Sequence, residues 1–128
     1  MRTMKDFLRI AAEQSAVDFG CSPEDFAADE NRFLVSKPTS GARVYCPQPV
    51  LFDMATYGRN TVAAGREDLI EAARELFGGL AEPHELFGPE KLAGLDRLLR
   101  EHGAKIGFAS HFFLPDPALF PAFSDPAP

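Results

Sequence analysis

The fold class is decided by residues 50–77, which read VLFDMATYGRNTVAAGREDLIEAARELF. Within this stretch, a strand is expected over residues 50–57, with Val50, Phe52, Met54 and Thr56 on one face. The turn residues 58–60 include a glycine and an asparagine, which tolerate positive φ, and residues 61–64 return as a second strand. The stretch therefore begins with an antiparallel hairpin.

A helix is expected directly after the hairpin, over residues 66–77. Its apolar side chains recur every three or four positions, acids occupy its first turn, and Gly78-Gly79 follows its end. Comparable start and stop signals predict a first helix between Thr3 and Gly20, a short helical turn at Ser22–Asp25 and a third helix from Pro89 to Gly103. Three main helices are therefore expected.

Further strands are indicated on both sides of the hairpin. Residues 32–36 form a compact apolar run, and a brief strand is expected at residues 43–45. Residues 105–114 are expected to form a strand with both faces at least half buried, as in a central strand. One face carries Ile106, Phe108, Ser110, Phe112 and Leu114, and the other carries Gly107, Ala109, His111 and Phe113. The elements together predict an α+β fold, with a mostly antiparallel sheet of about four to five strands and three main helices packed on it.

The composition fits one globular domain with a tail. The chain has 128 residues, of which 45% are hydrophobic, enough to build a core without disulfides or metals. Five of its eleven prolines fall in the last fourteen residues: Pro115, Pro117, Pro121, Pro126 and Pro128. Because proline lacks an amide donor, we expect a single domain over residues 1–114 and a Pro-rich tail or interdomain linker over 115–128.

The charge balance argues against nucleic acid and membranes as partners. The chain has 13 Lys and Arg against 19 Asp and Glu, and its sequence contains no basic cluster. Residues 1–20 carry charges along their length, so they resemble neither a signal peptide nor a membrane span. We therefore expect a cytoplasmic protein in which Cys21 and Cys46 are reduced thiols, without a zinc motif.

Several residues offer chemistry, each with a structural alternative. His111 is a candidate acid or base on an interior strand, although a histidine on an apolar face is more often a hydrogen-bonded core residue. His102, at a helix end, suits the negative end of the helix dipole without any further role. Cys46, His111 and Asp53 offer a nucleophile, a base and an acid, but no local signature supports that trio. No dinucleotide-binding or P-loop motif occurs.

Two polar segments are the better candidates for binding. Gln14, Ser15 and Asp18 lie at the end of the first helix, and the four-residue spacing of Gln14 and Asp18 puts them on one face. The turn from Tyr57 to Asn60 is either plain hairpin chemistry or the polar rim of a site. The candidate binding residues are Gln14, Ser15, Asp18, Tyr57, Arg59, Asn60 and His111.

Several short stretches share a pattern with a known group of enzymes. They are Phe7-Leu8 with Gln14-Ser15-Ala16 and Asp18, Cys21 to Phe26 with Glu30-Asn31, Gly41-Ala42-Arg43, Tyr57 to Ala64, and Phe108 to Pro115. Over roughly residues 4–117, this pattern resembles the N-terminal region of certain bacterial two-part N-acetyltransferases of the GNAT family.

This resemblance implies an N-terminal α+β domain followed by a GNAT domain that binds acetyl-CoA. The pyrophosphate turn of such a domain, an Arg or Gln followed by xxGxG or xxGxA, presents backbone amides at a helix N-terminus. This chain has no such turn, since the glycines between Gly58 and Gly65 are wrongly spaced. The resemblance thus implies a domain that shapes the acceptor site or the dimer, with no catalytic residue, cofactor or metal of its own.

The same resemblance implies partners. They are the GNAT catalytic domain, which would hold the acetyl-CoA, or a second copy of this chain. One alternative is a stand-alone binding or dimerisation module with no catalytic role, in which the apolar segment Leu119–Phe123 docks on a partner. Another is a small cysteine-dependent hydrolase that uses Cys46 and His111.

Overall fold

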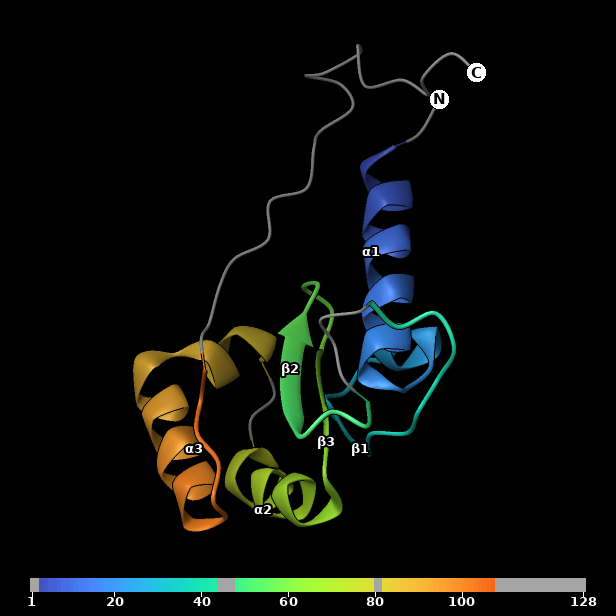
Figure 1. Ribbon diagram of the computed structural model, residues 1–128. Helices are drawn as coiled ribbons and strands as arrows, with labels where there is room; N and C mark the ends of the chain where they lie inside the picture. The colour runs from blue at the N-terminus through green and yellow to red at the C-terminus, as the bar shows by residue number, and fades with distance from the viewer. Residues whose placement is uncertain (1–2, 44–47, 80–81, 108–128) are drawn as a thin grey trace.

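The computed structural model describes residues 3–43, 48–79 and 82–107. These residues form three α-helices, two short 3-10 helices and a three-stranded sheet, arranged as Figure 1 shows. In chain order the elements are α1 (Met4–Phe19), η1 (Pro23–Ala27), β1 (Arg32–Val35), β2 (Phe52–Thr56), β3 (Thr61–Gly65), α2 (Glu67–Phe77), η2 (Pro83–Phe87) and α3 (Pro89–Glu101).

The sheet is mixed, and its strands lie in the order β1-β3-β2. β2 and β3 pair antiparallel, with Phe52 opposite Gly65, so the predicted hairpin is confirmed. β1 pairs with the other side of β3 in parallel, with Arg32 opposite Val62. The α+β class and the three main helices are also confirmed.

The prediction of a mostly antiparallel sheet of four to five strands does not match the described residues, which hold one parallel and one antiparallel pair. The difference arises because β3 lies between β1 and β2. β2 reverses through the hairpin, so β3 runs in the same direction as β1. Arg43 and residues 105–107 are described and are not in strands, whereas residues 44–45 and 108–114 lie outside the described residues.

β3 is the buried centre of the fold. All five of its residues are buried, and a side chain at Gly65 would place its Cβ 2.5 Å from the carbonyl oxygen of Leu51. Such small residues let helices pack on both faces of the sheet.

Each face of the sheet has its own cluster of buried apolar residues. The α2–α3 face packs on α2, η2 and α3, through Leu69, Ala73, Phe77, Leu86, Leu95 and Leu99, with Phe33, Phe52, Met54 and Ile106 beside them. The α1 face packs on α1 and η1, through Ala16, Phe19, Phe26, Val62 and Ala64, with Leu34, Ala55 and Tyr57 beside them. The sheet therefore separates two cores, and the residues of β2 alternate between them.

The helix ends follow the local signals in the sequence. Thr3 and Asp6 form a capping box in which the Asp6 carboxylate accepts the Thr3 backbone N–H at 2.8 Å. Gly20 ends α1 with a φ of 75°, in the left-handed region that favours glycine. Ser22 and Asp25 form a second capping box at the start of η1. These predictions were confirmed because caps are encoded by neighbouring residues.

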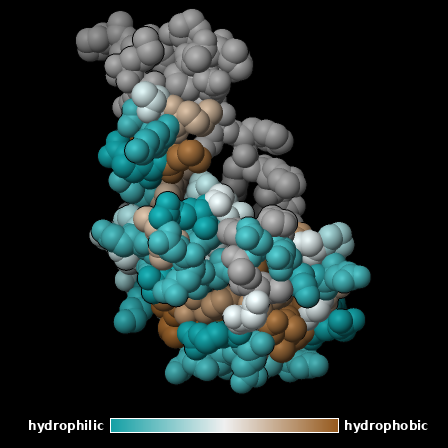
Figure 2. All heavy atoms as spheres, turned by 180° about the vertical axis from the view of Figure 1, so that it is seen from behind, coloured by the Kyte–Doolittle hydropathy of each residue, from teal (hydrophilic) through white to brown (hydrophobic). Residues whose placement is uncertain are grey.

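The first half of α1 extends beyond the sheet (Figure 1). Three large apolar side chains on it, those of Met4, Leu8 and Ile10, are exposed. Figure 2, the view from behind, shows apolar side chains open on this part of the helix. The second half of α1 instead packs against the sheet through Ala16 and Phe19.

Candidate functional site

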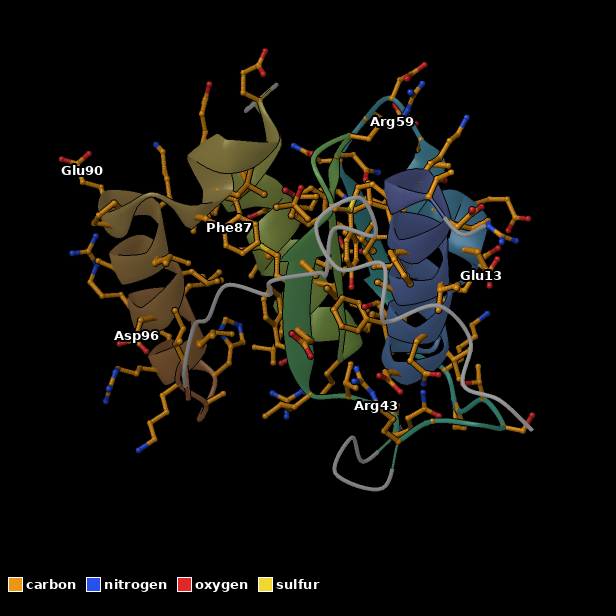
Figure 3. The ribbon with its side chains drawn as sticks, turned by 90° about the horizontal axis from the view of Figure 1, so that it is seen from above. Glu13, Arg43, Arg59, Phe87, Glu90 and Asp96 are labelled. Atoms are coloured by element: carbon orange, nitrogen blue, oxygen red, sulfur yellow. The ribbon has the colours of Figure 1, made fainter. Side chains whose placement is uncertain are left out.

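A polar cluster lies at the C-terminal end of α1. We call it the Asp18 cluster, and it consists of Gln14, Asp18 and Arg43. Asp18 is only 2% exposed. Its carboxylate accepts hydrogen bonds from the Gln14 side chain and from the Arg43 backbone N–H, both at 2.9 Å. The Arg43 guanidinium forms an ion pair with the same carboxylate, beside α1 (Figure 3). Gln14 and Asp18 thus share one helix face, as their spacing predicts.

The pKa of the Asp18 carboxyl lies below its ordinary value. Burial is the largest single influence and acts to raise this pKa, but the hydrogen bonds from Arg43 and Gln14 and the positive charge of Arg43 together lower it by more. Asp18 is therefore ionised at neutral pH, and it accepts hydrogen bonds rather than donating a proton.

A second polar contact joins α1 to the hairpin. The hydroxyl oxygens of Ser15 and Tyr57 lie 2.6 Å apart, and the Tyr57 hydroxyl also donates to the Ala11 carbonyl at 3.3 Å. The Tyr57 ring packs edge-on against Phe26, with the ring centroids 5.6 Å apart. The structure thereby brings Ser15 and Tyr57, two predicted candidates, to the same end of α1 as the Asp18 cluster.

The loop after β1 completes the end of α1. The side-chain amide of Gln48 donates to the carbonyls of Val17 and Asp18, at 2.6 and 2.9 Å. The Thr39 hydroxyl also donates to the Val17 carbonyl, at 2.6 Å. These bonds satisfy carbonyls that a helix end leaves without an intrahelical partner.

Three residues at this end of α1 were absent from the sequence-based candidates: Thr39, Arg43 and Gln48. All three come from the loop after β1, far from α1 in the chain. Of the three, only Arg43 had a signal in the sequence, because it belongs to the Gly41-Ala42-Arg43 stretch that resembles the acetyltransferase family.

The remaining turn candidates, Arg59 and Asn60, point to a different part of the molecule. Arg59 pairs with Asp29, and both side chains are largely exposed. Asn60 is 1% exposed, and its amide nitrogen donates to the carbonyls of Asp25 and Glu30, at 2.7 and 2.9 Å. Asn60 therefore ties the hairpin turn to η1 and to the segment that leads into β1.

The residues proposed for acid-base or thiol chemistry are not assembled within the described residues. His111 and Cys46 lie outside them. His102 follows α3, and its Nδ1 lies 3.0 Å from the Leu98 carbonyl oxygen, as expected for a histidine at a helix end. Asp53 is exposed on β2. Burial, helped by the nearby Asp25 carboxylate, raises the pKa of the Cys21 thiol to about 12, so this thiol stays protonated.

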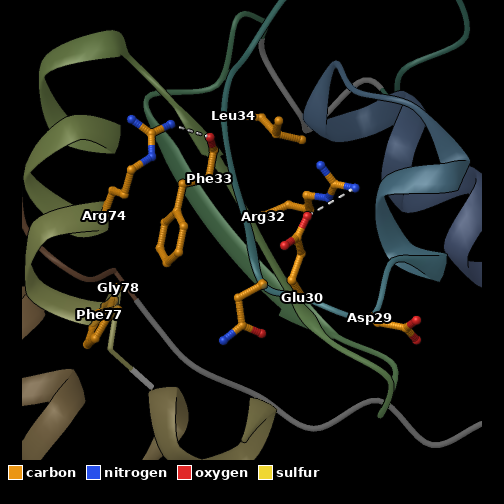
Figure 4. Close-up of a pocket in the computed structure, with 9 residues that line it drawn as sticks. Asp29, Glu30, Arg32, Phe33, Leu34, Arg74, Phe77 and Gly78 are labelled. Carbon is orange, nitrogen blue, oxygen red and sulfur yellow. Dashed lines mark hydrogen bonds and ion pairs between the residues drawn. The ribbon is translucent and has the colours of Figure 1, made fainter. Parts of the chain in front are cut away.

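A cavity of about 540 Å³ lies beside β1 and the C-terminal end of α2 (Figure 4). Its charged side chains have partners: Arg74 donates to the Phe33 carbonyl at 2.8 Å, and Arg32 pairs with Glu30 at 3.5 Å. The cavity shares no residue with the Asp18 cluster. Within residues 3–43, 48–79 and 82–107, no group of three or more His, Cys, Asp or Glu side chains is placed to hold a metal ion.

Among the described helices, none combines the length and the apolar character that crossing a membrane requires. No model of a known protein family, no curated protein and no solved structure matches the chain.

Proposed function

We propose that this chain is the N-terminal domain of a GNAT-like N-acetyltransferase. In this role it shapes the acceptor site or the dimer and transfers no acetyl group by itself. The proposal begins from the family-like stretches of the sequence. Its support from the fold is that four of those stretches belong to one packed unit, around the α1 face of the sheet, and they include α1, η1, Arg43 and the hairpin.

One observation carries the proposed non-catalytic role. The carboxylate of Asp18 is hydrogen-bonded to both the helix and the loop after β1, since Gln14 and Arg43 both donate to it. Likewise, the hydroxyls of Ser15 and Tyr57 bond to each other. Polar side chains that satisfy one another in this way fix the positions of helix, loop and hairpin, and such a rigid frame suits a domain that presents a surface to a catalytic partner.

The finer features of the proposed domain follow from the sequence. The domain covers residues 1–114, its sheet has four to five strands, and residues 115–128 are the linker to a GNAT domain that binds acetyl-CoA. Its partner is that domain or a second copy of the chain. We place it in the cytoplasm, where Cys21 and Cys46 remain reduced.

Isothermal titration of the chain with acetyl-CoA tests whether it lacks a cofactor site. We expect no saturable heat. Tight binding with one acetyl-CoA per chain would overturn the proposal. Reading the coding sequence in frame beyond codon 128 gives an independent test, because the proposal requires an xxGxG or xxGxA turn preceded by Arg or Gln there.

A stand-alone binding or dimerisation module is the second candidate function. The observation that favours it is the projecting half of α1, where Met4, Leu8 and Ile10 are exposed. Sedimentation of the chain with and without residues 116–128 tests whether the tail is the docking segment of such a module. A dimer that dissociates when the tail is removed would make the tail an interface, whereas an unchanged sedimentation coefficient fits a linker.

A further inference from the structure

The cavity beside β1 follows the strand and the residues that lead into it. Its lining includes the six consecutive residues 29–34, and the end of α2 contributes Arg74, Phe77 and Gly78 as a wall (Figure 4). Its volume of about 540 Å³ lies within the range of sites that bind small molecules. Because consecutive residues of one extended segment line the cavity, it suits a ligand that lies along that segment.

The backbone of Phe33 faces this cavity. The Ser36 N–H donates to the Gly65 carbonyl of β3 at 2.9 Å, so Ser36 is directed toward β3. The direction alternates along a strand, so the backbone groups of Leu34 also face β3 and those of Phe33 face the opposite side. The Phe33 carbonyl confirms this direction, because it accepts a hydrogen bond from Arg74 on α2. The Phe33 N–H therefore lies on the cavity side of the strand.

One end of the cavity is cationic. The Arg74 guanidinium donates to the Phe33 carbonyl at 2.8 Å and to the Glu71 carboxylate at 3.1 Å. Since a guanidinium carries five N–H donors, these two bonds fix its position and leave further donors for a ligand. A carboxylate at this end can accept hydrogen bonds from Arg74 and from the Phe33 N–H together.

The other end of the cavity is acidic. Asp29 and Glu30 line it, and Figure 4 shows Asp29 at the end opposite Arg74. Asp29 pairs with Arg59, and Glu30 pairs with Arg32 at 3.5 Å. The side chains of Asp29 and Glu30 are 88% and 74% exposed, and ion pairs of such exposed groups are weak. Both carboxylates are therefore accessible to an ammonium group.

We propose that this cavity binds a short peptide of about three residues, extended parallel to β1, with its ammonium group at Asp29 and Glu30 and its carboxylate at Arg74. At about 3.3 Å per residue, the path from Glu30 to Phe33 spans about 10 Å, which is the length of an extended tripeptide. The direction follows from the charges, since the acidic end precedes β1 and the cationic end lies beside Phe33. This assignment goes beyond the proposed function and does not depend on it.

The opposite charges at the two ends favour a zwitterion over a simple ion. A carboxylate ligand without an ammonium group leaves the acidic end uncompensated, and an amine without a carboxylate leaves Arg74 uncompensated. Between the two ends the lining includes Phe33, Leu34 and Phe77, whose side chains are apolar. This lining favours small apolar side chains on the peptide.

Nuclear magnetic resonance of the isotope-labelled full chain, titrated with trialanine, tests the proposal. We expect saturable shifts of the Phe33 and Gly78 amides and of the Arg74 Nε–H. N-acetyl-trialanine lacks the ammonium group and trialanine amide lacks the carboxylate, so each should bind about tenfold more weakly. Trialanine that leaves the Phe33 amide unshifted, or equal binding of all three peptides, would overturn the proposal. These comparisons use the unmodified protein, so they do not depend on the folding of a variant.

A variant then tests the placement of the carboxylate. Arg74→Gln should weaken the binding of trialanine about tenfold and leave the binding of trialanine amide unchanged, because the amide has no carboxylate to lose. Arg97→Gln, at an exposed position on α3, is the matched control and should change neither. An Arg74→Gln variant that weakens both peptides equally would overturn the placement of the carboxylate. None of these outcomes involves acetyl-CoA, so they are independent of the test of the proposed function.

Discussion

The hydroxyl groups of Ser15 and Tyr57 lie 2.6 Å apart, although 42 positions separate the two residues in the sequence. Ser15 lies on α1, and Tyr57 directly follows β2. This contact connects the last turns of the first helix to the hairpin and thereby closes the α1 face of the sheet. It is therefore a sensitive place to test how the candidate site is held.

A double-mutant cycle should find Ser15 and Tyr57 coupled. Ser15→Ala and Tyr57→Phe each remove one hydroxyl, and each should lower the free energy of unfolding by about 1 kcal/mol. Their effects should not add, because either change breaks the same bond. Chemical denaturation measures the four proteins. Ser40→Ala, at an exposed position, serves as the control and should leave stability unchanged. Additive losses would show that the two hydroxyls do not interact in solution.

Replacing Asp18 should be costly. Asp18→Ala removes the acceptor of the Arg43 N–H and the Gln14 amide and leaves a buried gap. We expect a loss of about 2–4 kcal/mol in the free energy of unfolding. Asp29→Ala, in an exposed pair with Arg59, is the matched control and should have little effect. Equal losses of stability in the two variants would show that the Asp18 cluster does not stabilise the fold.

Low pH should remove the stabilisation of the fold that Asp18 provides. The folded-state pKa of Asp18 is lowered, chiefly by Arg43 and Gln14, which together outweigh the burial that acts to raise it. A group of this kind stabilises the fold above its unfolded pKa, near 3.9, and the stabilisation is lost as pH falls through the folded pKa. The stability difference between the wild type and Asp18→Asn should therefore be constant above about pH 5 and shrink below pH 4. A difference that grows in acid would contradict this assignment.

Gly20 should tolerate no side chain. It ends α1 in the left-handed region, and a Cβ there would lie 1.9 Å from the Lys37 carbonyl oxygen. Gly20→Ala should cost roughly 2 kcal/mol or more, because the backbone conformation and the close approach both oppose it. Gly79→Ala is the control, since a Cβ at that position would meet no atom within 4 Å and its φ is not positive. Thermal unfolding of both variants measures the contrast, and equal losses would contradict the crowding at Gly20.

The Cys21 thiol should react slowly. Burial raises its pKa to about 12, from an ordinary value of 9.0. At neutral pH its thiolate fraction is then about a thousandfold below that of a free cysteine, and alkylation by iodoacetamide should be slowed by a similar factor. The Cys46→Ser variant isolates Cys21 for this measurement. Alkylation at the rate of free cysteine would show that the surroundings of Cys21 open readily.

The helices were predictable because their signals are local. The Thr3 and Asp6 capping box, Gly20 and Pro89 each specify a helix end through residues only a few positions away. The contact between Gln14 and Asp18 is local for the same reason, since four positions separate them on one helix.

The parallel place of β1 beside β3 and the rest of the site were not predictable, because they depend on the path of the chain. Arg43 contacts Asp18 from 25 positions away in the sequence, and no short motif in the sequence specifies the path of the loop that carries it. The insertion of β3 between β1 and β2 likewise follows from packing. Five buried, small residues can sit between two helical layers, and alternation alone does not reveal this.

The parallel pairing of β1 with β3 also gives the assembly of this fold an order. β2 and β3 are joined by a short turn, so closing the hairpin costs little chain entropy. β1 precedes both of them in the chain, and among the described strands it pairs only with β3, so its pairing waits until β3 has been synthesised. Capture of β1 by the finished hairpin is thus the step that encloses α1, and we expect it, rather than helix formation, to set the pace of folding.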